Sequence, residues 1–175
     1  MTDRAVPERI TWAVRVLAPA PDDQLLEIGC GPGVAVAHIC EHLAGGQILA
    51  IDRSPTAIAR ATRRNAGCIA AGKAVLRTAA LESLQAADLL EGREGFDKVF
   101  ALNVNLFWVR SPTRELGLIT TVLKPGGALA LFYGYGTPGQ GRPRVPEVLF
   151  RHLTEAGFAV ESRSGPSVAG VLATR

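Results

Sequence analysis

The chain has few of the residues on which several classes of protein depend. It contains only three cysteines, Cys30, Cys40 and Cys68, and their spacing matches neither a zinc site nor a disulfide framework. Lysine is rare, the basic residues are mostly scattered arginines, and aromatic residues make up 6% of the chain. We therefore expect reduced thiols in a cytoplasmic protein, no metal site, and no basic, aromatic-rich surface that would bind nucleic acid.

Long apolar runs are also missing. The longest charge-free apolar stretch, Val99 to Val109, is too short to cross a bilayer, and the N-terminus has charges and Pro7 where a signal peptide needs an apolar core. We expect no membrane association. A hydrophobic fraction of 47% and a formal charge of +3 suit a single domain over residues 1–175, with a short helix at about 8–18 and the core from about 22 to 175. The oligomeric state stays open.

The most informative stretch is Leu25 to Gly33, an apolar run that meets Glu27 and then breaks into alternating glycines. A helix-compatible stretch, Val34 to Leu43, follows, so the glycines occupy a strand-to-helix turn at which the main chain approaches a ligand closely. A second apolar strand, Gln47 to Ile51, ends at Asp52. This carboxylate follows the glycines by roughly 20 residues, the interval that places it beside the ribose of a bound nucleotide.

Strands and helices alternate through the next part of the chain. Ser54-Pro55 predicts a helix start, with Ser as the N-cap and Pro at the first helical position, and Ser111-Pro112 predicts another by the same logic. The alternation is typical of an open α/β sheet with right-handed crossovers and a site along the carboxyl ends of its strands. Further strands are expected at 73–78, 96–102 and 128–133, and further helices at 9–17, 81–90 and 147–156.

The C-terminal part differs from this alternation. Two short strands, Phe158 to Arg163 and Val168 to Ala173, are joined by Gly165-Pro166. A connection that short joins antiparallel neighbours. We therefore predict an α/β fold, a three-layer αβα sandwich around a seven-stranded, mostly parallel sheet whose reversed strand lies in a C-terminal β-hairpin.

Three features together resemble the class I S-adenosylmethionine-dependent methyltransferases, and the resemblance covers essentially the whole chain. They are the run E-I-G-C-G-P-G from Glu27 to Gly33, Asp52 at the end of the second strand, and Leu123-Lys124-Pro125-Gly126-Gly127 before the fifth strand. The resemblance implies S-adenosylmethionine as methyl donor and S-adenosylhomocysteine as product.

Simple chemistry supports the cofactor site that this resemblance implies. Glu27 can accept a hydrogen bond from the cofactor's ammonium, and Asp52 has two acceptor oxygens for the ribose hydroxyls. The glycines would let the main chain pass beneath the ribose and the amino-acid arm, where any Cβ would collide. The predicted cofactor-binding residues are Glu27, Gly29, Cys30, Gly31, Gly33, Asp52, Arg53, Ala80, Leu81 and Asn103.

The chain departs from the family pattern after the third strand. Similar methyltransferases often have an Asp there that accepts from the adenine amino group, whereas this chain has Ala79. We expect adenine to be bound by the backbone at Ala80 and Leu81, or by Glu82.

The acceptor should meet the methyl group where the fourth and fifth strands end. Methyl transfer from a sulfonium is an in-line displacement that needs alignment and a dry site, so no catalytic base is assigned. The predicted acceptor wall is Trp12, Asn105, Phe107, Trp108, Tyr133 and Tyr135, with core packing as the alternative for Trp12, Phe107 and Trp108. A small-molecule acceptor is favoured, because the Asn-Pro-Pro-aromatic motif of amino methyltransferases acting on nucleic acids and proteins is absent.

Other functions remain open from the sequence. One is a nicotinamide-binding Rossmann oxidoreductase, which is disfavoured because Val34 replaces the third glycine of G-x-G-x-x-G. Another is a module that binds S-adenosylmethionine without catalysis. The stretch from His38 to His42 spells H-x-x-E-H, as in inverted zinc peptidases, but it lies on the helix after the glycine loop without a downstream acidic ligand, so zinc is not expected.

Overall fold

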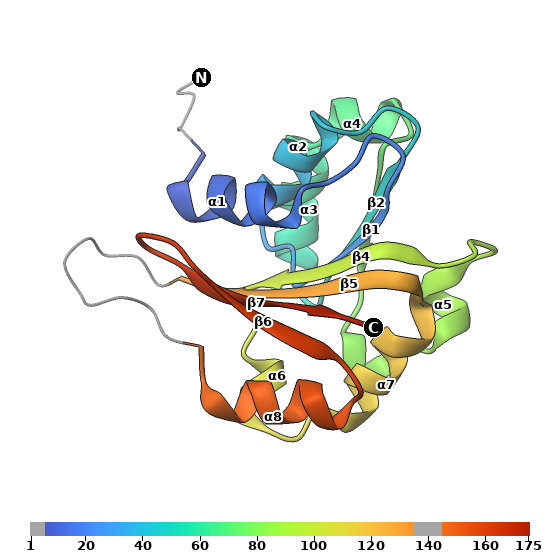
Figure 1. Cartoon of the computed structure of the whole chain (residues 1–175). Coiled ribbons are helices and arrows are strands. Elements are labelled where there is room, and N and C mark those ends of the chain that lie inside the picture. The colour runs from blue at the N-terminus through green and yellow to red at the C-terminus, as the bar shows by residue number, and fades with distance from the viewer. Residues whose placement is uncertain (1–5, 135–144) are drawn as a thin grey trace.

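One seven-stranded sheet organises the computed structural model, which describes residues 6–134 and 145–175 (Figure 1). The strand order is β3-β2-β1-β4-β5-β7-β6, and β7 runs in the opposite direction to the other six strands. The strands are β1 (Gln24–Ile28), β2 (Gln47–Asp52), β3 (Ala74–Thr78), β4 (Phe96–Leu102), β5 (Leu123–Tyr133), β6 (Ala159–Ser164) and β7 (Ala169–Thr174). The predicted sheet with a reversed strand in a C-terminal hairpin is confirmed.

Helices cover both faces of the sheet, which makes three layers (Figure 1). One face carries α1 (Glu8–Leu17), α2 (Val34–Cys40), α3 (Pro55–Arg64) and α4 (Ala66–Ala70), and the other carries α5 (Ala86–Leu90), α6 (Leu106–Val109), α7 (Thr113–Val122) and α8 (Glu147–Glu155). None of the helices in the described ranges is long and apolar enough to cross a membrane.

The core consists of two apolar clusters, one on each face of the sheet. Successive strand residues alternate between them, so that Leu25 packs with the α1–α4 layer and Leu26 with the α5–α8 layer. In β4, Phe100 packs with the α1–α4 layer and Val99 with the α5–α8 layer. Because both faces are covered, the central strands read as nearly continuous apolar runs in the sequence.

The predicted helix 81–90 is wrong in part. A single 3₁₀ turn, Leu81–Ser83, comes first, and α5 starts only after Gln85. The Asp88 carboxylate accepts from the Gln85 main-chain N–H at 2.8 Å, and the Gln85 side chain accepts from the Asp88 main-chain N–H. This reciprocal cap starts a new helix and so divides the segment.

Two further expected boundaries are corrected. Ser111 does not cap α7; Pro112 occupies the N-cap position, and the Ser111 hydroxyl pairs instead with that of Thr113 at 2.9 Å. The Lys124-Pro125-Gly126-Gly127 run lies within β5 rather than before it, because the pairing register shifts between Phe96 and Lys98 of β4. A bulge of this kind accommodates a proline, which cannot donate to the ladder.

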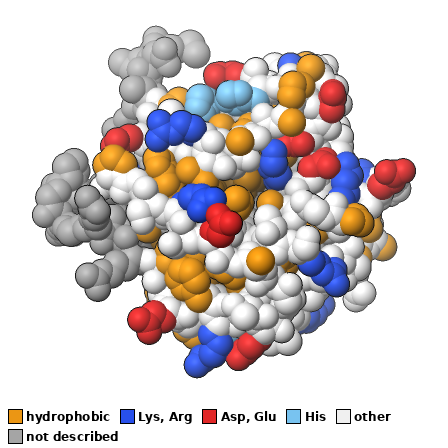
Figure 2. Space-filling model, viewed as in Figure 1, with side chains coloured by type: hydrophobic (Ala, Val, Ile, Leu, Met, Phe, Trp, Pro, Cys, Tyr) orange, Lys and Arg blue, Asp and Glu red, His pale blue; other side chains and the backbone are white. Residues whose placement is uncertain are grey.

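Charged side chains of both signs are interspersed over the face of the molecule seen in Figure 2. Histidine side chains gather near the top of this view, in the region of α1 and α2. The rings of His38 and His42 lie edge to face with centroids 5.8 Å apart, and His38 Nδ1 is 3.2 Å from a Glu41 carboxylate oxygen. Among the described residues, no group of three His, Cys, Asp or Glu side chains is placed to hold a metal ion.

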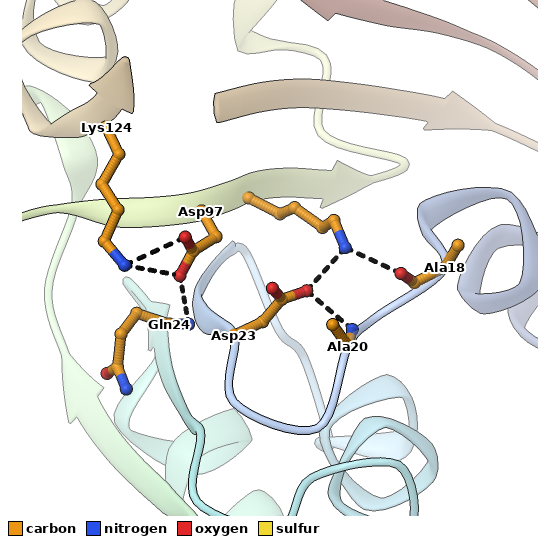
Figure 3. Close-up of polar contacts among 7 residues, drawn as sticks. Ala18, Ala20, Asp23, Gln24, Asp97 and Lys124 are labelled. Atoms are coloured by element: carbon orange, nitrogen blue, oxygen red, sulfur yellow. Dashed lines mark hydrogen bonds and ion pairs between the residues drawn. The ribbon is translucent and has the colours of Figure 1, made fainter. Parts of the chain in front are cut away.

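Ion pairs fasten the amino-terminal edge of the sheet to the segment that joins α1 to β1 (Figure 3). Asp97 pairs with the Lys124 ammonium at 2.8 Å and accepts from the Gln24 N–H at 2.7 Å, while Lys98 pairs with Asp23 at 2.5 Å. Burial raises the pKa of Asp97, but the hydrogen bonds from Lys124 and Gln24 outweigh it, so its pKa lies below the ordinary value. These cross-links lie at the edge of the sheet opposite the carboxyl ends of the parallel strands.

Candidate active site

A cleft of about 620 Å³ lies along the carboxyl ends of β1 to β4. The strand order reverses between β1 and β4, and open α/β sheets bind their ligands at such a reversal. The cleft is large enough for a small-molecule ligand. Its lining residues are Ile28, Gly29, Ile51, Asp52, Arg53, Ala79, Ala80, Leu81, Glu82, Leu102, Asn103, Val104, Asn105, Leu106, Val109 and Arg110.

The three glycines of the turn after β1 all have left-handed backbones, with φ of 72° at Gly29, 53° at Gly31 and 72° at Gly33. They differ in what an added Cβ would meet. At Gly29 it would lie 2.6 Å from Val104 Cγ2, and at Gly33 it would lie 2.5 Å from Asn65 Nδ2, whereas at Gly31 nothing lies within 4 Å. An added Cβ at Gly29 or Gly33 would therefore collide with the protein itself, whereas at Gly31 it would meet open space.

The Asp52 carboxylate, at the end of β2, is oriented by main-chain amides. Its Oδ2 accepts from the Gly31 N–H at 2.8 Å, and its Oδ1 accepts from the Ser54 N–H at 2.8 Å. Each carboxylate oxygen has a second lone pair. The side chain thus ties β2 to the glycine turn and still presents two acceptors to the cleft, as a ribose with two hydroxyls requires.

Glu27 is the most perturbed carboxylate of the site. The residue is 2% exposed, and its Oε2 has no hydrogen-bond partner within the part of the chain that the structure describes. Burial, together with the charge of Asp52, raises the pKa of Glu27 to about 8. A buried acceptor without a donor is costly. The arrangement fits a cationic ligand group such as the ammonium of S-adenosylmethionine, which would supply both the donor and the charge.

Of the predicted cofactor-binding residues in β1 and the turn after it, Gly29 lines the cleft, whereas Glu27, Cys30, Gly31 and Gly33 are not among the lining residues. Cys30 is buried, and burial followed by the charges of Glu27 and Asp52 raises the pKa of its thiol. The thiol therefore stays protonated, and no nucleophilic role follows from it.

The end of α3 supports the glycine turn from behind. The buried Asn65 donates from Nδ2 to the Gly33 carbonyl at 3.0 Å and to the Ala61 carbonyl at 2.9 Å, and Arg64 Nε donates to the Pro32 carbonyl at 3.0 Å. The sequence pattern did not reveal these supports, since an Asn at the end of a helix resembles an ordinary cap.

The segment after β3 forms the wall opposite the glycine turn. Ala79, Ala80, Leu81 and Glu82 all line the cleft, and the Ala79 N–H donates to the Asp52 carbonyl at 3.0 Å. The main-chain oxygen of Glu82 accepts from Arg114, so this turn is linked to α7. Besides Asp52, Glu82 is the carboxylate on the cleft lining. It lies close in sequence to Ala79, the position at which similar methyltransferases have an Asp.

Asn103 and Asn105 both line the cleft at the end of β4. The side chain of Asn103 does not point to a free ligand position, since its Nδ2 donates to the Gly134 carbonyl at 3.0 Å and its Oδ1 accepts from the Gly134 N–H at 2.7 Å.

The predicted aromatic wall lies mostly in the core. Phe107 is fully buried, and Trp12 is buried with its ring edge-on to Phe132 at 5.7 Å, so neither faces the cleft and the expectation for both is corrected. The rings of Trp108 and Tyr133 pack edge to face at 6.4 Å and do not line the cleft either. Tyr135 lies outside the described residues.

The outer lip of the cleft was missed because no motif marks it. Val109, at the end of α6, lines the cleft and is 60% exposed. The neighbouring Arg110 donates from Nη2 to Glu115 Oε1 at 2.8 Å, and Glu115 is buried.

Comparison with protein-family models identifies the family. A model described as a methyltransferase domain matches residues 26–129, which include the glycine turn, Asp52 and the wall after β4. The chain belongs to the methyltransferase domain family. This membership confirms the resemblance to the S-adenosylmethionine-dependent enzymes and S-adenosylmethionine as the cofactor of this methyltransferase, and it sets aside the nicotinamide alternative.

Solved structures show that the methyltransferase shares its fold over nearly its whole length. A SAM-dependent methyltransferase from Aquifex aeolicus matches with a TM-score of 0.74 and 18% identity over 98% of this chain and 94% of that one. One from Mesorhizobium loti gives a TM-score of 0.67 and 19% identity over 97% and 99%. Magnesium protoporphyrin IX methyltransferase from Synechocystis, with bound SAM, gives 0.66 and 17% over 97% and 77%. A search of curated proteins found no match.

Proposed function

We propose that this methyltransferase holds S-adenosylmethionine in the cleft through Glu27, Gly31 and Asp52, and transfers its methyl group to a small-molecule acceptor. The observation that carries the assignment is the buried Glu27 Oε2, which has no hydrogen-bond partner among the described residues, beside the turn in which an added Cβ at Gly31 would meet open space. A buried carboxyl group in this setting fits a cationic donor, and the cofactor's amino-acid arm ends in one.

The remaining contacts follow from the geometry of the lining. Asp52 receives the ribose hydroxyls on the lone pairs that Gly31 and Ser54 leave unused. Arg53 and the segment from Ala80 to Glu82 enclose the adenine, with the Glu82 carboxylate as acceptor for the amino group that an Asp binds in similar enzymes. The described residues share a single sheet, which supports one domain for the chain.

When bound, S-adenosylmethionine supplies an electrophilic methyl group on a positively charged sulfur. The chain's part in the reaction is to align the donor with the acceptor and to exclude water. Asp52 holds the ribose of the donor and Glu27 its ammonium, while Asn105 and Leu106 after β4 form the wall along which the acceptor approaches. Because the sulfur loses its charge as the methyl group leaves, the exclusion of water from the site favours the transition state over the ground state.

Two observations support a small acceptor. The face in Figure 2 carries mixed charges rather than the one-sign surface that a nucleic acid needs. In addition, the structural neighbour from Synechocystis is, by its name, a methyltransferase of a small molecule.

Label transfer tests the proposal. The protein is incubated with S-adenosylmethionine that carries a labelled methyl group and with separate panels of phenols, carboxylic acids, amines and thiols, and also with total RNA and with protein. We expect transfer to one small-molecule class, loss of transfer in Asp52→Ala, and normal transfer in Glu94→Gln, which changes an exposed carboxylate away from the cleft. Labelling of RNA or protein alone overturns the acceptor class, and tight cofactor binding without transfer to any panel overturns the catalytic assignment.

A further inference from the structure

The end of β4 adopts a backbone conformation that few residues tolerate. Asn103 has φ of 58°, in the left-handed region. Asparagine enters this region more readily than most residues with a side chain. Its main-chain N–H still donates to the Phe132 carbonyl at 2.8 Å, so the turn begins while β4 remains paired with β5.

The Asn103 side chain adds two hydrogen bonds to Gly134, the residue that follows β5. Its amide donates to the Gly134 carbonyl at 3.0 Å and accepts from the Gly134 N–H at 2.7 Å. In an antiparallel ladder, two paired residues likewise exchange two main-chain hydrogen bonds. We call the two bonds between Asn103 and Gly134 the Asn103 clamp.

Asparagine meets all the requirements of the clamp. Glycine would adopt the left-handed backbone but has no side chain to bond. Aspartate tolerates the backbone and could accept from the Gly134 N–H, but its ionised carboxylate has no donor for the Gly134 carbonyl.

The clamp lies next to the wall that closes the cofactor cleft. Val104 follows it directly, and a Cβ on Gly29 would lie only 2.6 Å from Val104 Cγ2, so this side chain fills the space that Gly29 leaves. The Tyr133 hydroxyl donates to the Val104 carbonyl at 3.1 Å. The turn is thus held by the glycine turn on one side and by the end of β5 on the other, and Val104 and Asn105 are presented to the cleft.

We infer that Asn103 is a positioning residue whose side chain fixes the Val104–Asn105 wall against the glycine turn, and that this side chain is not a ligand of the cofactor. The inference rests on the proposed function of the cleft as the cofactor site. It assigns Asn103 a different role from that of Asp52 and Glu27, whose carboxylates act on the cofactor directly.

Two variants separate these roles. Asn103→Gly keeps the left-handed backbone and removes both clamp bonds, whereas Asn103→Asp keeps one bond and places an oxygen against the Gly134 carbonyl. Hydrogen exchange of the Gly134, Val104 and Asn105 amides is measured without ligand, and affinity for S-adenosylhomocysteine is measured by calorimetry. We expect exchange at Gly134 to be about tenfold faster in Asn103→Gly, as the loss of one net hydrogen bond implies, and affinity to fall by a similar factor in both variants.

Each outcome decides the inference. If Asn103→Asp binds the product as tightly as the wild type or more tightly, the side chain is a ligand of the ammonium and the inference fails. Wild-type exchange and affinity in Asn103→Gly also overturn it. If the wild-type protein binds no S-adenosylhomocysteine, the proposed function fails, and the exchange measurement alone then decides whether the clamp holds the wall.

Discussion

Replacement of Glu27 by Gln keeps the shape of the side chain but removes its ionisation, since an amide does not titrate. In the folded, cofactor-free protein the pKa of Glu27 is raised to about 8, by burial first and by the charge of Asp52 second. The substitution should therefore remove a pH dependence of stability and weaken binding of the cofactor.

The direction of the change in stability with pH follows from the pKa of Glu27 in the folded and unfolded states. Because the folded-state pKa lies above the ordinary value of 4.5, the folded protein holds this proton more tightly than the unfolded chain. The stabilisation is complete below about pH 4.5 and is lost as the pH rises through about 8. The full difference between the two pKa values corresponds to about 5 kcal/mol. Glu27→Gln should lose this dependence and be the more stable protein at pH 9.

Cofactor binding should respond in the opposite direction. The ammonium of S-adenosylmethionine favours the ionised carboxylate, so that binding near pH 7 releases a proton and wild-type affinity increases from pH 6 to pH 8. A hydrogen bond to a charged group contributes about 1.5 to 3 kcal/mol, so the Gln variant should bind about ten- to a hundredfold more weakly at pH 8.

Denaturant unfolding at pH 6 and pH 9 and calorimetry at pH 6, 7 and 8 in two buffers of different ionisation enthalpy measure these effects. Glu94→Gln, at an exposed carboxylate, serves as the control. A Glu27→Gln protein with wild-type affinity and a wild-type pH profile would refute both the buried proton and its link to the ligand.

Other substitutions test the remaining parts of the site. Asp52→Ala should reduce affinity for S-adenosylmethionine at least tenfold, roughly the effect of losing one charged acceptor; unchanged affinity in calorimetry would contradict the ribose assignment. Gly31→Ala should fold, with a loss of about 1 to 2 kcal/mol in stability because of its left-handed backbone, but should bind the cofactor poorly. Gly33→Ala should lose more stability, because its Cβ would lie 2.5 Å from Asn65 Nδ2. Equal denaturant midpoints for the two variants would contradict this prediction. Lys124→Met should lower stability without changing cofactor affinity, and it should shift acid unfolding to higher pH. The reason is that the lowered pKa of Asp97 contributes stability that is lost as pH falls below the ordinary value of 3.8. An unchanged acid transition would contradict this prediction.

The fold was predictable because its central strands are buried on both faces. The run Phe96 to Leu102 was predicted with its observed bounds, and the short Gly165-Pro166 connection required an antiparallel pair. Local signals failed where tertiary contacts decided the boundary. A helix cap at Gln85 divided the predicted helix 81–90. The Leu123–Gly127 run belongs to β5 because β5 pairs with β4 from Leu123 onward.

The cofactor side of the site was partly predictable for a related reason. The interval from the glycine turn to Asp52 follows from the length of a βαβ unit, and the structure joins the two through the hydrogen bond from Gly31 to Asp52. The reasons for Gly29 and Gly33 could not be read from the sequence, because the atoms they make room for, on Val104 and Asn65, are distant in the chain. Aromatic side chains after a strand are equally compatible with a wall or a core, and in Phe107 packing prevailed.

The most direct test of the account is a calorimetric titration of the wild-type protein with S-adenosylmethionine and S-adenosylhomocysteine at pH 8. The account predicts one-to-one binding of both, weakened in Glu27→Gln and in Asp52→Ala and retained in Glu94→Gln. A wild-type dissociation constant weaker than about 1 mM for both ligands, or affinities that neither carboxylate changes, would contradict it.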